Sequence, residues 1–303
     1  MSDYEKIIDV AIFTNGPLIS TDEATIKKYP PLRDEFKITD NLAIKRLNCD
    51  LSQKIMDACE PKEYNFRPTR QFAELYTIVR ENPPPEDDKK YEWDPDQKIQ
   101  YCILLSRLIH PTSISFEYAA RVYLKNNDEL FRIIRGPYQG LGTIAYLADT
   151  QRDWLTLNDV IELKALFEAF TKTTLSKEIS RAIWHFEYAA RIIELEVRWA
   201  LLITGIESLI HTWGENQFAK RLPHLCHNVG LDIIDFNEAK KMYKFRSSYV
   251  HGKGVLKNEI SETNELYCKM EYILRNIIKT AINDPELASI LSNPKKVRKK
   301  WPI

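Results

Sequence analysis

The chain is poor in glycine and has no long apolar segment. Only nine of its 303 residues are glycine, three of them grouped in residues 135–142, and long helical patterns fill most of the rest. No apolar run approaches the roughly 18 residues that a membrane-spanning helix needs. At the N-terminus, acidic residues precede a short apolar run, which is the reverse of the order in a signal peptide. These absences predict a soluble intracellular protein without a membrane partner.

Paired cysteines and net charge are also missing. The five cysteines are scattered, form no C-x-x-C pair and are odd in number, so we expect reduced thiols and a cytoplasmic location. The 43 basic and 43 acidic residues cancel. The overall charge therefore predicts no nucleic-acid partner, and any surface for such a partner has to be local.

Composition and periodicity divide the chain into five parts. β-Branched residues in 7–14 predict one or two short N-terminal strands, and apolar residues in 38–60 fall at helical spacing behind a candidate cap at Asp40. Three consecutive prolines followed by mixed charges interrupt the helical pattern after residue 81. The predicted parts are a mixed α N-terminal region (1–81), a linker or exposed loop (82–96), a helical middle region (97–179), a helical bundle (180–291) and a basic tail (292–303).

Four helical patterns make up most of the C-terminal region. The first is a long apolar helix over 185–214, and the second covers 216–228. The third begins at Asp235, with Glu238 placed for a capping box, and the fourth covers 262–282. Helices joined by short connections indicate an antiparallel bundle. We therefore predict a mainly all-α protein.

The third helix ends in YKFRSSYVHG, which carries Arg246 and His251. On an ideal helix these two side chains point about 140° apart, so they face one site only if the chain turns near Gly252. Histidine transfers protons near neutral pH, and arginine offers a planar fork to phosphate oxygens. The pair suits metal-free cleavage of RNA, in which the 2′-hydroxyl is an internal nucleophile. Basic residues also gather at helix C-termini because they complement the helix dipole, and this alternative stays open.

The same stretch resembles the R-x(4–6)-H signature of HEPN domains, in particular of the ApeA-like group. LEVRWALLITGIESLIHT and QFAKRLPHLC resemble neighbouring helices of that family, and the resemblance is best over 180–283. SRLIHPTSISFEYAARVYL and RDWLTLNDV resemble N-terminal regions that accompany such domains in prokaryotic proteins. The resemblance implies an all-α bundle that pairs through this helix, so that a homodimer brings two motifs into one composite site.

The resemblance also implies roles for individual residues. Many HEPN proteins are metal-independent endoribonucleases of toxin–antitoxin, phage-defence or RNA-processing systems, and others only bind. By position, Arg246 would contact phosphate and His251 would be the acid or base. Ser247 stands where active nucleases of the family often carry asparagine, aspartate or histidine. This difference from the family pattern bears on activity and not on the fold. Gly252 would let the chain turn after the histidine.

Further residues are expected to support this site. Glu207 lies in an apolar helix and is expected to brace Arg246, because buried charges need a partner. Tyr243 and Tyr249 lie one turn to either side of Arg246, where they supply a hydroxyl or stack on a base, or else serve as core or interface aromatics. Weaker phosphate contacts are predicted for nearby and C-terminal basic residues. These are Lys244, Lys253, Lys295, Lys296, Arg298, Lys299 and Lys300.

Two other motifs have simpler explanations. HLCH, at 224–227, offers three metal ligands but has no second ligand pair of the kind that zinc sites use, so we predict no metal. GLGTIA, at 140–145, fits G-x-G-x-x-A without a surrounding βαβ series, which favours a glycine-rich turn over a dinucleotide site. We expect no cofactor.

The leading hypothesis is a cytoplasmic, homodimeric, metal-independent endoribonuclease that acts on RNA, with a neutralising or sensor protein as a further partner. The alternative is a non-catalytic module that uses the same surface to bind RNA, a nucleotide or a protein. A third hypothesis places the activity in residues 1–174.

Overall fold

The computed structural model describes most of the chain, which divides into two compact units. The first unit comprises Met1–Gly142 and Thr150–Phe167, and the second comprises Thr143–Asp149 and Glu168–Ile303. The described residues are 4–14, 21–46, 49–59, 75–81, 97–111, 118–125, 129–135, 152, 154–192, 194–250 and 260–302.

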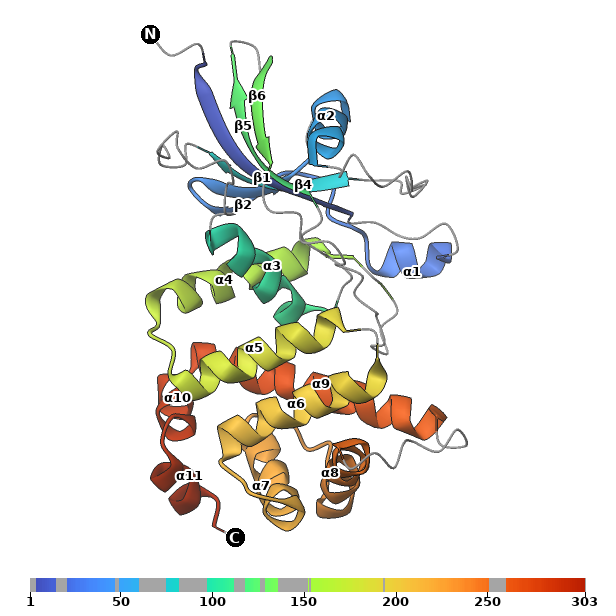
Figure 1. Ribbon diagram of the computed structural model, residues 1–303, viewed down its shortest axis with the longest axis vertical. Helices are drawn as coiled ribbons and strands as arrows, with labels where there is room; N and C mark the ends of the chain where they lie inside the picture. The colour runs from blue at the N-terminus through green and yellow to red at the C-terminus, as the bar shows by residue number, and fades with distance from the viewer. Residues whose placement is uncertain are drawn as a thin grey trace. The chain divides into compact units, whose positions relative to one another are not determined.

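The first unit is built on a six-stranded antiparallel sheet (Figure 1). The strand order is β2-β3-β4-β1-β5-β6, so the first strand in the sequence lies inside the sheet, between β4 and β5. The strands are β1 (Lys6–Thr14), β2 (Phe36–Thr39), β3 (Leu42–Lys45), β4 (Leu75–Glu81), β5 (Tyr118–Leu124) and β6 (Leu130–Arg135).

Alternation along β1 separates the two faces of the sheet. Ile8, Val10 and Ile12 point to one face, where they pack with Ile55 and Cys59 of helix α2 (Cys49–Cys59) in a buried apolar cluster. The remaining helices of this unit are α1 (Glu23–Lys28), α3 (Gln97–Ile109), which packs against β4, and the first part of α4 (Leu157–Lys172).

A buried ion pair lies on the opposite face of β1. Asp9 is directly opposite Arg121 in the β1–β5 register, and Arg121 donates to it through Nε at 2.7 Å and through Nη2 at 2.9 Å. The two side chains are 0% and 4% exposed. Two parallel charge-assisted hydrogen bonds satisfy both groups, which is the condition for burying opposite charges inside a sheet.

The prediction of a mainly all-α protein is wrong, because the sheet makes the first unit a mixed α/β structure. The one or two short strands expected near the N-terminus are only part of a sheet of six strands. The helical spacing over 38–60 is misleading, since Leu42 and Ile44 belong to β3 and only the second half of that range forms α2. Inside the middle region predicted to be helical, β5 is buried along its whole length and so lacks the alternation that marks a half-buried strand.

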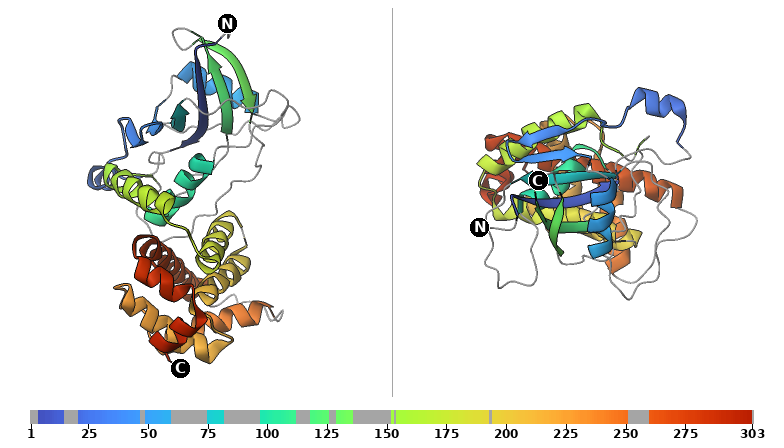
Figure 2. Two further views of the ribbon diagram at one scale, coloured as in Figure 1. Left: turned by 90° about the vertical axis from the view of Figure 1, so that its left-hand side faces the viewer. Right: turned by 90° about the horizontal axis from the view of Figure 1, so that it is seen from above.

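The second unit is helical. Helix α9 packs beside α5 and α6 (Figure 1, with two further views in Figure 2). Its helices, after the end of α4, are α5 (Lys177–Arg191), α6 (Leu195–Ile210), α7 (Glu215–Asn228), α8 (Phe236–Val250), α9 (Ile260–Asn283), α10 (Pro285–Leu291) and α11 (Pro294–Lys300).

The long helix predicted over 185–214 is in fact two helices. The chain leaves α5 at Ile192, which has extended backbone angles, and starts α6 at Leu195. Arg198 is buried in the first turn of α6, and its Nε donates to the carbonyl of Ile192. This hydrogen bond links the two sides of the break, and α5 and α6 pack against each other. Neither glycine nor proline marks this position in the sequence.

The other predicted bundle helices agree closely with the structure. The predicted helix 262–282 is α9 with slightly wider bounds, and the predicted helix 216–228 is α7. The capping box at the start of α8 is confirmed: Glu238 N–H donates to Asp235 Oδ1 at 2.8 Å, and Asp235 N–H donates to Glu238 Oε2 at 3.3 Å. Within the described ranges, no helix is both long enough and apolar enough to cross a membrane.

The predicted basic tail folds back onto the second unit as α11. Asn293 caps this helix, and Val297 and Trp301 are buried. Buried Arg221 of α7 donates from Nε to the carbonyl of Trp301 at 3.1 Å. The end of the chain is therefore docked by burial and by a charge-assisted hydrogen bond, while its lysines remain on the surface.

Candidate functional site

Helix α8 presents Arg246 from a well-anchored position. Buried Met242 lies one turn earlier, and its carbonyl accepts a hydrogen bond of 2.9 Å from Nε1 of Trp199 in α6. The Trp199 and Phe245 rings lie 5.1 Å apart. Because α8 packs on both α6 and α7, the orientation of its polar face is set by the core beneath it.

Arg246 lies against Glu207 of α6 and Tyr243 of its own helix. Its Nη2 is 3.7 Å from Glu207 Oε2, and the guanidinium lies 5.6 Å from the centre of the Tyr243 ring. The Tyr243 hydroxyl donates to Glu207 Oε1 at 3.1 Å. The structure thus brings together Glu207 and Arg246, as the sequence predicted, and Tyr243, also predicted to support the site, contacts both.

Burial is the main influence on the pKa values of Glu207 and Tyr243. Burial raises the pKa of Glu207, although the Arg246 charge and the Tyr243 hydrogen bond act in the opposite direction. Burial also raises the pKa of Tyr243, and the neighbouring Glu207 carboxylate adds to the shift. Tyr243 is therefore a hydrogen-bond donor at neutral pH.

The Arg246 guanidinium keeps hydrogen-bonding capacity for a ligand. The 3.7 Å separation from Glu207 is an ion-pair distance but too long for a hydrogen bond. The Arg246 side chain is 29% exposed, although its Nε is buried and has no hydrogen-bond partner among the described residues. Since an arginine carries five N–H donors, this side chain can engage an anion without first leaving Glu207.

Several predicted site residues cannot be placed. His251, Gly252 and Lys253 lie outside the described residues, as does the backbone turn that the Arg246–His251 pair requires. Tyr249 belongs to α8, but its side chain is also outside the described part. Ser247 is partly exposed on the same helix, and Lys244 is exposed. The pairing of Arg246 with His251 stays a prediction.

A cavity of about 650 Å³ adjoins Arg246. Arg181 from α5 and Arg298 from α11 also line it, together with Thr212 and Trp213 from the turn between α6 and α7. Of the basic tail residues predicted to contact RNA, Arg298 is among the lining residues. Lys295, Lys296, Lys299 and Lys300 are exposed on α11, and Lys296 Nζ donates to Ser289 at 2.6 Å.

Sequence reasoning missed Arg181, Thr212 and Trp213. The local signal is the sequence HTWG, at the end of the helix predicted over 185–214. His211 there has a left-handed conformation, with φ of 49°, and its Nε2 is 2.9 Å from the carbonyl oxygen of Leu291. Gly214 has φ of 117°, which only glycine adopts without strain. Together these residues turn the chain so that Trp213 is 83% exposed.

The HLCH segment does not form a metal centre with its neighbours. Cys226 is buried, and burial raises the pKa of its thiol to about 12, so it is protonated at neutral pH. His227 is exposed, with Nδ1 2.6 Å from Asp232. Across the described ranges, no three His, Cys, Asp or Glu side chains are arranged to hold a metal ion. The GLGTIA segment and the proline-rich residues 82–96 lie outside those ranges.

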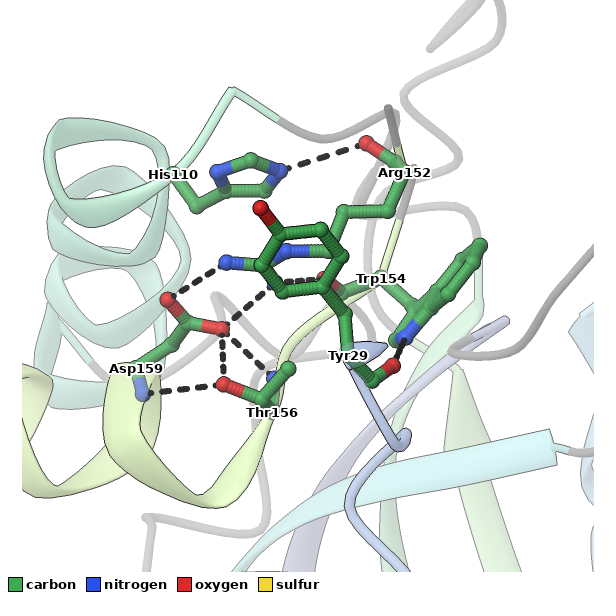
Figure 3. Close-up of polar contacts among 6 residues, drawn as sticks. All are labelled: Tyr29, His110, Arg152, Trp154, Thr156 and Asp159. Carbon is green, nitrogen blue, oxygen red and sulfur yellow. Dashed lines mark hydrogen bonds and ion pairs between the residues drawn. The ribbon is translucent and has the colours of Figure 1, made fainter. Parts of the chain in front are cut away.

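A second polar cluster lies in the first unit, around Arg152 (Figure 3). Arg152 forms two hydrogen bonds with Asp159, of 2.6 and 2.9 Å, and its guanidinium lies 5.3 Å from the centre of the Tyr29 ring. Asp159 also accepts hydrogen bonds of 2.6 Å from the backbone N–H and the hydroxyl of Thr156, at the start of α4. His110 Nε2 is 3.2 Å from the Arg152 carbonyl oxygen.

This cluster is a reinforced helix cap. Burial acts to raise the pKa of Asp159, but the hydrogen bonds from Arg152 and Thr156 outweigh it and lower the pKa. The Asp159 carboxylate is saturated by these donors, which suits a structural role. The cluster joins His110 of SRLIHPTSISFEYAARVYL to Arg152 of RDWLTLNDV, two stretches to which the sequence assigned no mechanism.

No protein-family model, curated protein or solved structure matches this chain.

Proposed function

We propose that the helical unit is a HEPN-type, metal-independent endoribonuclease in which Arg246 binds the scissile phosphate and His251 transfers protons. The observation that carries the proposal is the placement of Arg246: it is anchored beside Glu207 and Tyr243, has donors to spare and lines a cavity. A fixed guanidinium next to open space is what charge stabilisation of a phosphoryl transition state requires.

In the proposed reaction the 2′-hydroxyl attacks the adjacent phosphorus and the bond to the 5′ oxygen breaks. A 2′,3′-cyclic phosphate and a free 5′-hydroxyl result. His251 takes the 2′ proton or delivers a proton to the leaving 5′ oxygen, and in a homodimer the two copies of His251 would divide these tasks. Arg246 stabilises the negative charge on the phosphorus-bound oxygens. DNA lacks the 2′-hydroxyl and is expected to stay intact.

The test is cleavage of a labelled single-stranded RNA in EDTA by the wild type, Arg246→Ala and His251→Ala. We expect each variant to lose about a hundredfold or more in rate. Arg191→Ala is the matched control, since Arg191 is an exposed α5 arginine paired with Glu187 at 2.7 Å and does not line the cavity. Absence of cleavage by the wild type, or normal cleavage by both site variants, would contradict the proposal.

The same proposal includes a homodimer in the cytoplasm, with a neutralising or sensor protein as regulator in phage defence, toxin–antitoxin control or RNA processing. A composite site needs two copies of α8. A mass measurement in solution tests this part, and a strict monomer at working concentration would exclude the composite site.

A non-catalytic binding module is the second candidate. Ser247 favours it, because a serine hydroxyl does not titrate near neutral pH and offers no general acid or base beside Arg246. This candidate predicts RNA or nucleotide binding that weakens in Arg246→Ala, with no cleaved product at any time.

A further inference from the structure

Three arginines from three helices line the cavity beside Arg246. Arg181 comes from α5, Arg246 from α8 and Arg298 from α11. Among the residues that the structure describes, neither Arg181 nor Arg298 forms a salt bridge. The carboxylates that also line the cavity are Glu178 and Glu207. The cavity thus carries an excess of positive charge that its own side chains do not neutralise.

The electrostatic environment of neighbouring groups reflects this excess. Burial lowers the pKa of Arg221, and the nearby Arg298 charge lowers it further. Burial lowers the pKa of His185, and the Arg181 charge again adds to the shift. An anion bound between the arginines would relieve the repulsion on both neighbours.

A buried hydroxyl also lacks a partner in the cavity wall. Thr212 is 7% exposed, lines the cavity, and its Oγ1 has no hydrogen-bond partner within the described ranges. Buried hydroxyls are nearly always hydrogen-bonded, because an unpaired one loses its interaction with water without compensation. Because Oγ1 itself is buried, a ligand oxygen in the cavity supplies the missing partner only after a small movement of the cavity wall. This observation is independent of the arginines and also points to an oxygen-rich ligand.

Trp213 adds an aromatic surface next to these polar groups. It is 83% exposed and follows Thr212 directly in the turn between α6 and α7. Exposed tryptophan is uncommon on a surface that serves only solubility, and an indole face is a good platform for stacking a planar ring.

The residues that line the cavity indicate which kind of phosphate group it would bind. A phosphate diester carries one negative charge, whereas a phosphate monoester carries about 1.5 to 2 at neutral pH and presents three oxygens. Because Glu178 and Glu207 offset two of the three arginine charges, charge alone does not choose between the two esters. The number of oxygens favours the monoester, since each arginine can take one of its three oxygens through a charge-assisted hydrogen bond. We propose that this cavity binds a phosphate monoester, with Arg181, Arg246 and Arg298 around the phosphate and Trp213 stacked on the attached ring.

Two sources supply this chemistry: a free nucleotide, or the 5′-phosphorylated end of an RNA strand. The second source rests on the proposed function, because Arg246 would then bind RNA both at the scissile phosphate and at the 5′-terminal phosphate. A 5′-terminal phosphate bound here would orient the strand relative to His251. The site would in that case distinguish phosphorylated RNA ends from hydroxyl ends.

The test is binding to the full-length wild type in EDTA, measured by titration calorimetry. One pair of probes is a five-nucleotide 2′-O-methyl RNA that carries either a 5′-phosphate or a 5′-hydroxyl. Because its 2′ oxygens are methylated, this RNA has no internal nucleophile and stays uncut. The other pair is adenosine 5′-monophosphate and adenosine. We expect the phosphorylated probe to bind at least about tenfold more tightly than its unphosphorylated partner in one or both pairs. A preference in the RNA pair alone assigns the site to strand ends, and an equal preference in both pairs assigns it to the nucleotide itself.

Substitutions show whether this cavity is responsible. Arg181→Gln and Arg298→Gln change exposed side chains and are expected to remove most of the phosphate preference without unfolding the protein. Arg191→Gln on α5 and Lys220→Gln on α7 are exposed controls outside the cavity and should keep it. Thr212→Val removes only the buried hydroxyl, so the free protein should be at least as stable while the phosphorylated probe binds several-fold more weakly.

Equal affinity for phosphorylated and unphosphorylated probes would overturn the inference. So would a phosphate preference that survives in both Arg181→Gln and Arg298→Gln. Cleavage of unmodified RNA is scored separately, so the two proposals fail independently. If the protein prefers phosphorylated probes but never cuts RNA, the phosphate site is supported and the nuclease function is contradicted. If it cuts RNA without such a preference, the nuclease function is supported and the phosphate site is contradicted.

Discussion

The substitution Glu207→Gln tests two roles of Glu207 separately: its effect on the stability of the helical unit and its effect on the position of Arg246. At 3.7 Å and an effective dielectric constant near 20, the attraction between the two charges is about 4 kcal/mol before desolvation. The Glu207 side chain is 15% exposed, and burial outweighs the attraction, since the pKa of its carboxyl is raised. The charged form of Glu207 is therefore held at a net cost, and the ion pair adds little stability to the fold.

We expect Glu207→Gln to change the free energy of unfolding at pH 7 by less than about 1 kcal/mol, or to increase it. Glutamine keeps an oxygen to accept the Tyr243 hydroxyl, which now donates to Glu207 at 3.1 Å. Arg246, however, loses the charge that orients it. RNA cleavage, or RNA binding if the module is not catalytic, should therefore fall by about tenfold or more.

The assay is urea unfolding of the wild type and the variant from pH 4 to pH 8, beside RNA cleavage. A raised carboxyl pKa means that the native state binds more protons than the unfolded state, so wild-type stability falls as pH rises from the ordinary value of 4.5 through the folded pKa. The variant should lack this component, so its stability relative to the wild type should improve over that interval. A loss of more than about 2 kcal/mol at pH 7 would refute the reasoning, because it would show that the ion pair outweighs burial.

Three further predictions concern the two folded units, each measured by urea unfolding. Asp159→Asn should destabilise by about 3 kcal/mol at neutral pH, since it leaves Arg152 without its carboxylate. Because the pKa of Asp159 is lowered, this loss should shrink as pH falls below 3.8 through the folded value. Asp9→Asn should cost about 3 to 5 kcal/mol, because it strands the buried Arg121 charge. Gly205→Ala should cost about 1 kcal/mol, since its Cβ would lie only 3.0 Å from a leucine methyl of α9.

A specific result would contradict each of these three predictions. A pH-independent loss in Asp159→Asn would mean that the carboxylate is not the stabilising species. For Asp9, the double variant Asp9→Leu with Arg121→Met should recover stability, and failure to do so would assign the loss to packing rather than to the stranded charge. A stabilised Gly205→Ala would show that the leucine of α9 moves away and that the helical preference of alanine decides the sign.

The helical half of the protein was largely predictable from local patterns. Helices α7 and α9 were predicted within a few residues, and the Asp235–Glu238 capping box marked the start of α8. These signals depend on residues three or four positions apart, so they survive in any context that covers the apolar side of the helix. The break between α5 and α6 was not predicted, because neither glycine nor proline marks it; in the structure the buried Arg198 donates to the Ile192 carbonyl across it.

The sheet was mostly missed, because strand pairing is non-local. Ile8 of β1 pairs with Glu81 of β4 and with Val122 of β5, residues that lie far away in the sequence. Strand β5 is buried on both faces and shows no alternation, so nothing local separated it from a helix. The short β3 lay inside a range whose apolar spacing also fits a helix.

For the site, the sequence by itself determined the helix that carries Arg246 and the need of Glu207 for a partner, since a carboxylate in an apolar helix requires one wherever it lies. Only the tertiary structure decided what surrounds that pair. Arg181, Arg298 and Thr212 belong to different segments, and they share a cavity because α5, the α6–α7 turn and α11 converge there. Spacing along one helix is a local property, whereas burial and convergence depend on the packing of the whole unit.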